Sequence, residues 1–357
     1  MARLNSDNTT GGKIKAALDE FGLPRLIIAL FLAVLFIAAP FVGCNLATQF
    51  TNVINRFSWN AILVLSMVPM VHSGCGLNFG LPLGVISGLL GATLSIQFGF
   101  KGFTSFVMAI LIATPFAIIL GGGYGWLLNK IKGGEMMIAT YVGFSSVSFM
   151  CMMWLLLPYT SPTMVWGLEG KGLRTTISLE GFYDQALAGI LKIKIGHFEI
   201  PTGTLSFFAI LAFGMWAFLH TKTGTAMTAV GSNPAYAKAA GVNVDKMRLL
   251  SVILSTWLAA VGILTYEQGF GFIQLYNAPF FMALPAVSAI LIGGASVNKA
   301  SISNVIIGTI LYQGIVTMTP TVMNSAIHMD MSEVIRVIAS QGMILYALTR
   351  KTGGKKA

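Results

Sequence analysis

The sequence predicts an all-α, polytopic membrane protein with about ten transmembrane helices, some of them broken or short. Composition is the first reason. The chain has 357 residues, of which 55% are hydrophobic and only 10% are charged, whereas about a quarter of the residues in a soluble domain are charged. The second reason is its mean hydropathy of +0.78. Apolar runs recur along the whole chain, and many approach the ~20 residues that a helix needs to cross a bilayer.

The two ends of the chain are polar. Residues 1–25 mix both charges and contain no apolar core followed by a small-residue cleavage site. We therefore expect a cytoplasmic N-terminal segment rather than a cleaved signal peptide. Residues 26–348 form the expected membrane domain, and residues 349–357 form a basic cytoplasmic tail.

Apolar runs separated by polar or glycine-rich breaks divide the membrane domain into spans. The expected spans are residues 26–43, 59–72, 76–98, 105–128, 136–158, 204–220, 249–267, 280–297, 302–318 and 333–348. The second span and the last three are short. This leaves open that one of them re-enters the membrane rather than crossing it.

Basic residues predict the orientation of the chain. With the N-terminus inside, fifteen of the 22 Lys and Arg residues fall in inner segments and six in outer loops. The outer six are Arg56, Lys101, Lys171, Arg174, Lys192 and Lys194. We therefore expect both termini in the cytoplasm, an even number of spans, and a net charge of +10 that reports orientation rather than nucleic-acid binding.

The longest connection, residues 159–200, is expected outside the membrane. Within it, "EGFYDQALAGIL" places Phe182, Ala186 and Ile190 at helical spacing. This spacing predicts a short helix lying on the outer membrane surface. Two roles remain open for the loop: shielding the ends of the spans, or gating.

Glycine recurs every fourth residue at the start of the third span. On a helix, Gly76, Gly80, Gly84 and Gly88 would form a stripe that lets another backbone approach closely, either in static packing or as a moving contact. Prolines in several spans predict kinks or breaks. Broken spans are a non-specific signal of a central substrate pathway. These prolines are Pro82, Pro115 and Pro285.

Several residue patterns are absent from the sequence. The spans contain no chain of acidic residues and histidines, as a proton-driven transporter needs, and no arginine-rich voltage sensor. No phosphate-cradling loop and no zinc motif is present. The three cysteines and four histidines are scattered, and packing or span-end positions account for them better than metal binding. A channel and a self-powered secondary transporter are therefore disfavoured, and we expect the energy for transport to come from another chain.

The stretch "AVGSNPAYAKAAGVNVDKM", residues 229–247, is polar and too short to span. Asn233 suits a helix N-cap, Pro234 the first helical position, and Gly241 the C-terminal stop. Two readings remain open: a mere connector, or a lever whose alanines let a motor protein approach while Tyr236 and Lys238 supply specificity.

Three blocks of sequence resemble the permeases of bacterial ABC importers in the ribose and simple-sugar branch, a branched-chain-amino-acid-like transport family. The stretch from Ala229 looks like that family's cytoplasmic loop, with Gly231, Asn233, Ala239, Ala240 and Gly241 at or near its motif positions. "IGGASVNKASISNVIIGT" resembles its late glycine-rich block, with Gly293 and Gly294 assigned to helix packing. "SGCGLNFGLPLGVISG" resembles its early glycine-rich block.

Two segments lean instead toward nucleoside-type permeases. They are "NFG", residues 78–80, and "EMMIATYVGF", residues 135–144. We therefore expect import of a simple sugar of the ribose or galactose type, with import of a nucleoside or a riboflavin-like compound as the alternative.

The resemblance implies a permease subunit in the bacterial inner membrane that is not itself an enzyme. Its implied partners are a second permease subunit, identical or related, two cytoplasmic ATPase domains that hold ATP and Mg²⁺, and an external substrate-binding protein. The chain itself is expected to bind no cofactor and no metal. Residues 221–248 would form the coupling loop. The substrate pathway is expected to include Asn78, Phe79, Tyr141, Ser145, Glu267 and Gln268.

Overall fold

The computed structural model describes residues 23–131, 133–166, 172–190, 192–195, 198–296, 299–327 and 332–349. Most of the expected N-terminal segment and nearly all of the basic tail lie outside the described residues, as do Lys171, His197, Asn298 and His328.

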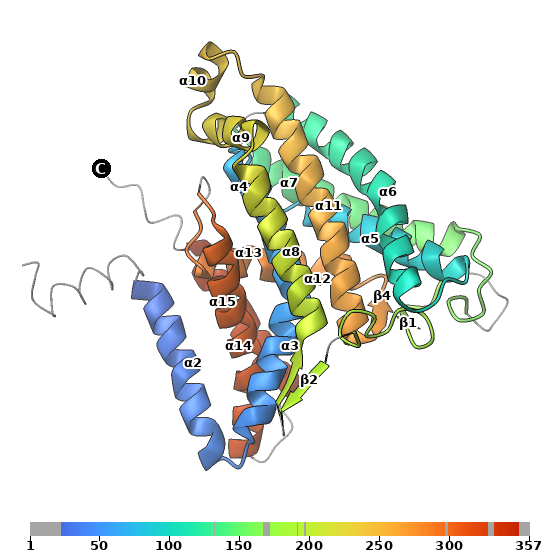
Figure 1. Ribbon diagram of the computed structural model, residues 1–357, viewed down its shortest axis with the longest axis vertical. Coiled ribbons are helices and arrows are strands. Elements are labelled where there is room, and N and C mark those ends of the chain that lie inside the picture. The colour runs from blue at the N-terminus through green and yellow to red at the C-terminus, as the bar shows by residue number, and fades with distance from the viewer. Residues whose placement is uncertain are drawn as a thin grey trace, which may run out of the picture.

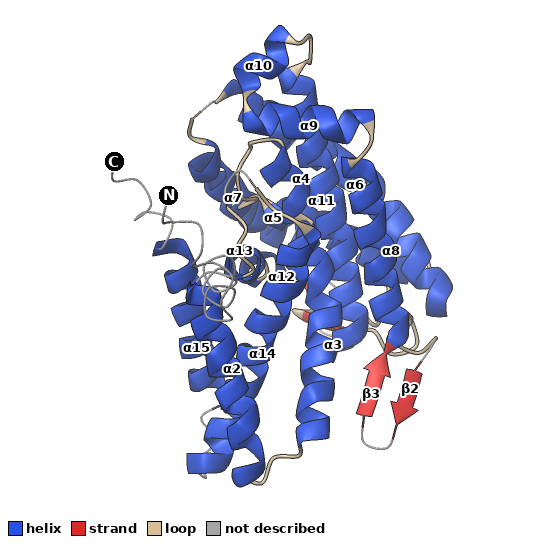
Figure 2. Cartoon of the chain, turned by 60° about the vertical axis from the view of Figure 1, so that its left-hand side comes forward, coloured by secondary structure: helices blue, strands red, loops and turns tan. Residues whose placement is uncertain are grey.

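Helices dominate the described part of the chain (Figures 1 and 2). The helices are α2 (Leu23–Phe41), α3 (Leu46–Leu65), α4 (Met67–His72), α5 (Leu81–Gln97), α6 (Gly102–Lys130), α7 (Glu135–Leu156), α8 (Thr202–Leu219), α9 (Lys222–Ser232), α10 (Pro234–Ala239), α11 (Val244–Phe270), α12 (Ala278–Phe281), α13 (Ala283–Ile292), α14 (Ile302–Ile327) and α15 (Ser332–Thr349). The strands are β1 (Thr176–Ser178), β2 (Lys192–Ile195), β3 (Phe198–Pro201) and β4 (Phe272–Gln274).

The predicted all-α membrane architecture is confirmed. Among the described residues, six helical stretches are long and apolar enough to cross a membrane: Leu46–His72, Gly102–Lys130, Glu135–Leu156, Thr202–Leu219, Val244–Phe270 and Ile302–Ser325. Three shorter apolar stretches accompany them: Arg25–Phe41, Leu81–Gln97 and Ala278–Ile292.

The second span is longer than its sequence indicates. Helix α3 begins at Leu46, after Asn45, whose Oδ1 accepts from the Ala47 backbone N at 2.9 Å. Hydropathy missed this half of the helix because it carries polar residues, two of which, Gln49 and Thr51, are buried in the bundle. Arg56 was predicted in an outer loop; this is wrong, since Arg56 lies within α3.

The third span is shorter than predicted. Helix α5 begins at Leu81, and Gly74 and Gly76 precede it with φ of +74° and +80° in non-helical backbone. Pro82 therefore occupies the first turn of the helix, where proline is tolerated, rather than interrupting the helix. Gly76 and Gly80 lie outside the helix, so the expected four-glycine stripe is reduced within α5 to Gly84 and Gly88.

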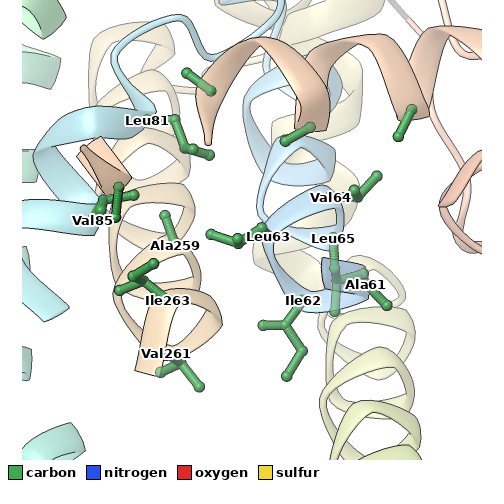
Figure 3. Packing of buried hydrophobic residues seen from close by; sticks show 14 of the residues in the cluster. Ala61, Ile62, Leu63, Val64, Leu65, Leu81, Val85, Ala259, Val261 and Ile263 are labelled. Atoms are coloured by element: carbon green, nitrogen blue, oxygen red, sulfur yellow. The ribbon is translucent and has the colours of Figure 1, made fainter. Parts of the chain in front are cut away.

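Helix α11 lies at the centre of the bundle and packs against α3, α5 and α6. Figure 3 shows Ala259, Val261 and Ile263 of α11 among buried residues of α3 and α5. A Cβ on Gly84 would lie 2.5 Å from Ala259 Cβ and 2.6 Å from the Thr256 carbonyl oxygen. This backbone contact allows helices to associate where apolar lipid offers little driving force.

The C-terminal helices pack around α14, which contacts α13, α15, α2 and α3. Here too the contacts depend on glycine. A Cβ on Gly293 would collide with the Asn304 carbonyl oxygen, and one on Gly308 with that of Ala289. Gly294 has φ +88°, and the Arg25 guanidinium occupies the space beside it.

The predicted surface helix in the outer loop is wrong. Residues 180–190 form successive turns, with Gly181 at φ +81° and Gln185 at φ +48°. Backbone groups of this segment make tertiary hydrogen bonds instead of helical ones. The Gln185 backbone N, for example, donates to the Gln268 carbonyl oxygen at 2.8 Å. Tyr183 and Leu187 are buried against the protein, while Ile190, on the predicted apolar face, is exposed.

Short strands complete this end of the molecule. Strand β1 pairs antiparallel with β4, with Ile177 opposite Ile273, and β2 pairs with β3 as a hairpin (Figure 2). The strands lie toward the end of the bundle opposite α9 and α10 (Figure 1).

Candidate functional site

Helix α10 stands at one tip of the molecule, beyond the ends of α9 and α11 (Figure 1). Its start is capped by Asn233, whose Oδ1 accepts from the Tyr236 backbone N at 3.1 Å, and Pro234 is the first helical residue. Its end is a left-handed Gly241 at φ +82°, after which the Val242 backbone N donates to the Ala237 carbonyl oxygen at 2.9 Å. This is a Schellman closure, which only a residue tolerant of positive φ completes without strain.

One alanine anchors α10, and the rest of the helix faces outward. Ala237 is buried, whereas Tyr236 is 70% exposed, and Pro234, Lys238 and Ala239 are exposed as well. Ala240 and Gly241 are also exposed. A shallow hollow beside the helix is lined by Pro234, Ala235, Lys238, Gly241, Val242, Asn243, Val244 and Asp245. The tip therefore offers a small-residue surface next to a hollow with one base and one acid.

Gly231 lies in α9, outside this tip. A Cβ there would collide with the His72 carbonyl oxygen and lie 2.9 Å from the Gly74 backbone N. The His72 side chain bonds on both sides, with Nδ1 3.1 Å from Thr228 Oγ1 of α9 and Nε2 2.8 Å from the Ala300 carbonyl oxygen. This cluster fixes α9, and through it the base of α10, to the end of α4.

The α10 end of α11 is fastened by a charged pair. Arg248 is buried; its Nη2 donates to Glu135 Oε1 of α7 at 2.6 Å and its Nε to Cys75 Sγ at 3.3 Å. Glu135 Oε2 also accepts from the Gly133 backbone N at 3.0 Å. The pair joins α11, α7 and the non-helical segment before α5.

Buried hydroxyls fasten the middle of α11. Ser251 Oγ donates to Ser73 Oγ, and Ser255 Oγ donates to the Ser66 carbonyl oxygen, both at 2.6 Å. Asn78 is fully buried: its Nδ2 donates to Ser255 Oγ at 2.8 Å, and Tyr124 Oη donates to its Oδ1 at 3.4 Å. Non-helical backbone at membrane depth is tolerated where protein satisfies it, and Asn78 helps to hold such a segment.

The opposite end of α11 holds the loop before β2. Tyr183 Oη donates to Glu267 Oε2 at 3.1 Å, while Glu267 Oε1 has no hydrogen-bond partner among the described residues. Gln268 Oε1 accepts from the Leu187 backbone N at 3.1 Å, and its Nε2 donates to Thr204 Oγ1 at 3.4 Å. Both α11 residues are buried and tie the loop to the helix.

The residues predicted for the substrate pathway occupy three places rather than one. Asn78, Glu267 and Gln268 lie in buried contacts at the middle and far end of α11. Tyr141 and Ser145 are exposed on α7. Phe79 is half-buried beside α7, and its carbonyl oxygen would be 2.9 Å from a Cβ on Gly143. A shared pathway role for this set stays a prediction.

Sequence reasoning missed the contacts that hold α11. They are made by Glu135, Arg248, Tyr183, Ser251 and Ser255. Two signals were available. Ser251 and Ser255 stand four apart and so share one helix face, and Glu135 and Arg248 are opposite charges at the starts of two spans.

These spans define a multi-pass helical membrane protein. Residues 49–348 match the family of branched-chain amino acid transport system permease components. The chain belongs to this family of membrane permeases, and the resemblance found in its sequence is confirmed.

Curated relatives span most of the chain. It is 22% identical to a xylose transport system permease protein of Haemophilus influenzae, over 93% of this chain and 96% of that protein. It is 24% identical to a ribose import permease protein of the same organism, over 83% of each. A nucleoside ABC transporter permease protein of Lactococcus lactis is 25% identical over 52% of each. No solved structure matches the chain significantly.

Proposed function

We propose that this chain is the membrane-spanning permease subunit of an ATP-driven importer for a simple sugar. Family membership supports the permease role, and the sugar permeases among its relatives support the substrate class. Partner ATPase subunits hydrolyse ATP and hold the Mg²⁺, a second permease subunit completes the pathway, and an external binding protein delivers the substrate.

The observation that carries this proposal is the geometry of α10. A helix capped at both ends, anchored by buried Ala237 and otherwise exposed, transmits a push from a docked protein to α9 and α11. The α10 end is then the cytoplasmic end, the strand end faces outside, and both termini lie in the cytoplasm of a bacterium, in its inner membrane.

A bulky residue on α10 tests the coupling. We expect Ala239→Trp to uncouple ATP hydrolysis from uptake in proteoliposomes holding the permease, the cognate ATPase and the binding protein, because the indole separates the docked surfaces. Gly122→Trp is the matched control, since a Cβ on Gly122 of α6 meets nothing within 4 Å. Normal coupling of hydrolysis to uptake in the Ala239→Trp complex would refute the proposal.

Nucleoside import is the second candidate. The nucleoside permease relative favours it, as do the segments at residues 78–80 and 135–144. A thermal-shift screen of the cognate binding protein against pentoses, hexoses and nucleosides separates the two. Stabilisation by nucleosides alone would overturn the sugar assignment and leave the permease role intact.

A further inference from the structure

Two interruptions in the helical backbone converge on neighbouring residues of α7. The first is the non-helical segment before α5, whose Phe79 carbonyl oxygen abuts Gly143. The second is the short α12, whose Phe280 ring lies 5.0 Å from the Phe144 ring, centroid to centroid, with the planes tilted by 37°. Gly143 and Phe144 lie near the middle of the 22-residue α7, and hence near mid-depth of the membrane.

The aromatic pair is not part of the packed core. Phe144 is 40% exposed and Phe280 is 44% exposed. Tyr141, one turn before Phe144 on the same face of α7, and Phe281 of α12 are exposed as well. The adjacent face of α7 is the packed one, with Gly143, Val147 and Met150 buried, so Phe144 lies at the edge of the packed surface.

Lipid is a poor occupant for this exposed face. Helix α12 is only four residues long and is divided from α13 by the single residue Met282, whose backbone stays near helical; the irregular backbone is the turn before α12, which ends at an exposed Asn277. Irregular backbone at membrane depth is tolerated only where protein buries it or where it lines a water-filled cavity. Binding sites in transporters commonly lie where discontinuous helices meet near the midplane.

We propose that Phe144 and Phe280 form a stacking site for the ring of the transported compound. Aromatic faces carry a partial negative charge and suit the C–H face of a furanose or pyranose ring, which free sugars and nucleosides share. Tyr141 and Phe281 flank the pair, and Ser148, one turn beyond Phe144, is an exposed hydroxyl on the same face. A group of side chains that is mostly aromatic with few polar groups is typical of small-molecule sites.

This inference rests on the proposed function, and its test separates the two. Phe144→Leu and Phe280→Leu keep the apolar bulk but lose the ring, while Phe144→Tyr and Phe280→Tyr keep the ring. Phe149→Leu is the matched control, because Phe149 is also exposed but lies on another side of α7. Each variant is assembled with the cognate ATPase and binding protein in proteoliposomes, and uptake of labelled ribose, xylose and adenosine is measured.

We expect each leucine variant to lower uptake of the transported compound about twofold to tenfold below saturation. The tyrosine variants and Phe149→Leu should transport normally, and ATP hydrolysis without substrate should be unchanged in all of them. Normal uptake by both leucine variants would overturn the stacking site. Leucine variants that lose both uptake and the permease dimer on size exclusion would also overturn it. In that case the Phe144–Phe280 face would be a contact between two permease subunits. If the unaltered complex moves neither these three compounds nor a hexose with ATP, the proposed function itself fails.

Discussion

Arg248 of α11 and Glu135 of α7 form an ion pair at 2.6 Å at the α10 end of the bundle, with 9% and 20% of their side chains exposed. Arg248 is the fifth residue of α11, close to the segment that leads out of α10. The pair therefore links the tip proposed to receive force to α7, which carries the proposed stacking site.

Removing one partner of this pair leaves a charge poorly solvated. We expect Arg248→Ala to lower the free energy of unfolding by about 2 kcal/mol. This loss is smaller than for a fully buried ion pair, because the Glu135 side chain keeps part of its contact with solvent. Thermal melting of the purified permease measures the change. Glu135→Gln combined with Arg248→Ala should cost less than the sum of the two single changes, and strict additivity would show that the two side chains act independently.

Asn78 depends on Ser255 for one of its hydrogen bonds. Ser255→Ala would leave the Asn78 amide without its 2.8 Å acceptor and the Ser66 carbonyl oxygen without its 2.6 Å donor. We expect a loss of about 1–2 kcal/mol in the free energy of unfolding. Ser148→Ala is the control, because exposed Ser148 of α7 donates to the Phe144 carbonyl oxygen of its own helix. Equal effects of the two changes would contradict a structural role for this network.

The contact between α5 and α11 requires the absence of a side chain at Gly88. A Cβ there would collide with Ile263 and lie 2.7 Å from the Ala260 carbonyl oxygen. We therefore expect Gly88→Leu to abolish accumulation of folded permease in membranes, as judged by size exclusion in detergent. Gly123→Leu in α6, where a Cβ meets nothing within 4 Å, should accumulate normally. Folded Gly88→Leu protein would show that the two helices can separate freely.

Tyr183 is the donor that the structure places on buried Glu267. Burial, reinforced by the nearby Glu267 carboxylate, raises the pKa of Tyr183 well above its ordinary value, so the phenol keeps its proton across the physiological pH range. We expect Tyr183→Phe to leave both Glu267 oxygens without a donor and to loosen the loop on α11. Limited proteolysis should then cleave residues 159–200 faster than in the unaltered protein. Tyr236→Phe, at an exposed tyrosine of α10, is the control, and equal cleavage rates would contradict the link.

Hydropathy and helix-end signals predicted most of the architecture. They worked for α10 because Asn233, Pro234 and Gly241 act locally, through capping and backbone conformation. They failed for α3, whose first half carries the buried polar residues Gln49 and Thr51, and for residues 180–190, where tertiary hydrogen bonds to Gln268 replace helical ones.

The interior contacts were harder to predict, for a physical reason. Arg248 and Glu135 are 113 residues apart and Asn78 and Ser255 are 177 apart, so no local pattern pairs them. Two residues expected in the pathway, Asn78 and Gln268, are polar groups whose partners lie in other segments, and polarity in a span marks structural hydrogen bonds as readily as substrate contacts.

Helix α10 is the element proposed to receive force from an ATPase subunit. Cross-linking tests this role most directly, in a permease whose Cys44, Cys75 and Cys151 are replaced by serine. A short bifunctional thiol reagent should join Tyr236→Cys, on the exposed face of α10, to the cognate ATPase in the assembled complex. Phe272→Cys, exposed on β4 at the opposite end, should give no such product. Absence of the Tyr236→Cys cross-link, or equal cross-linking at Phe272→Cys, would contradict the account.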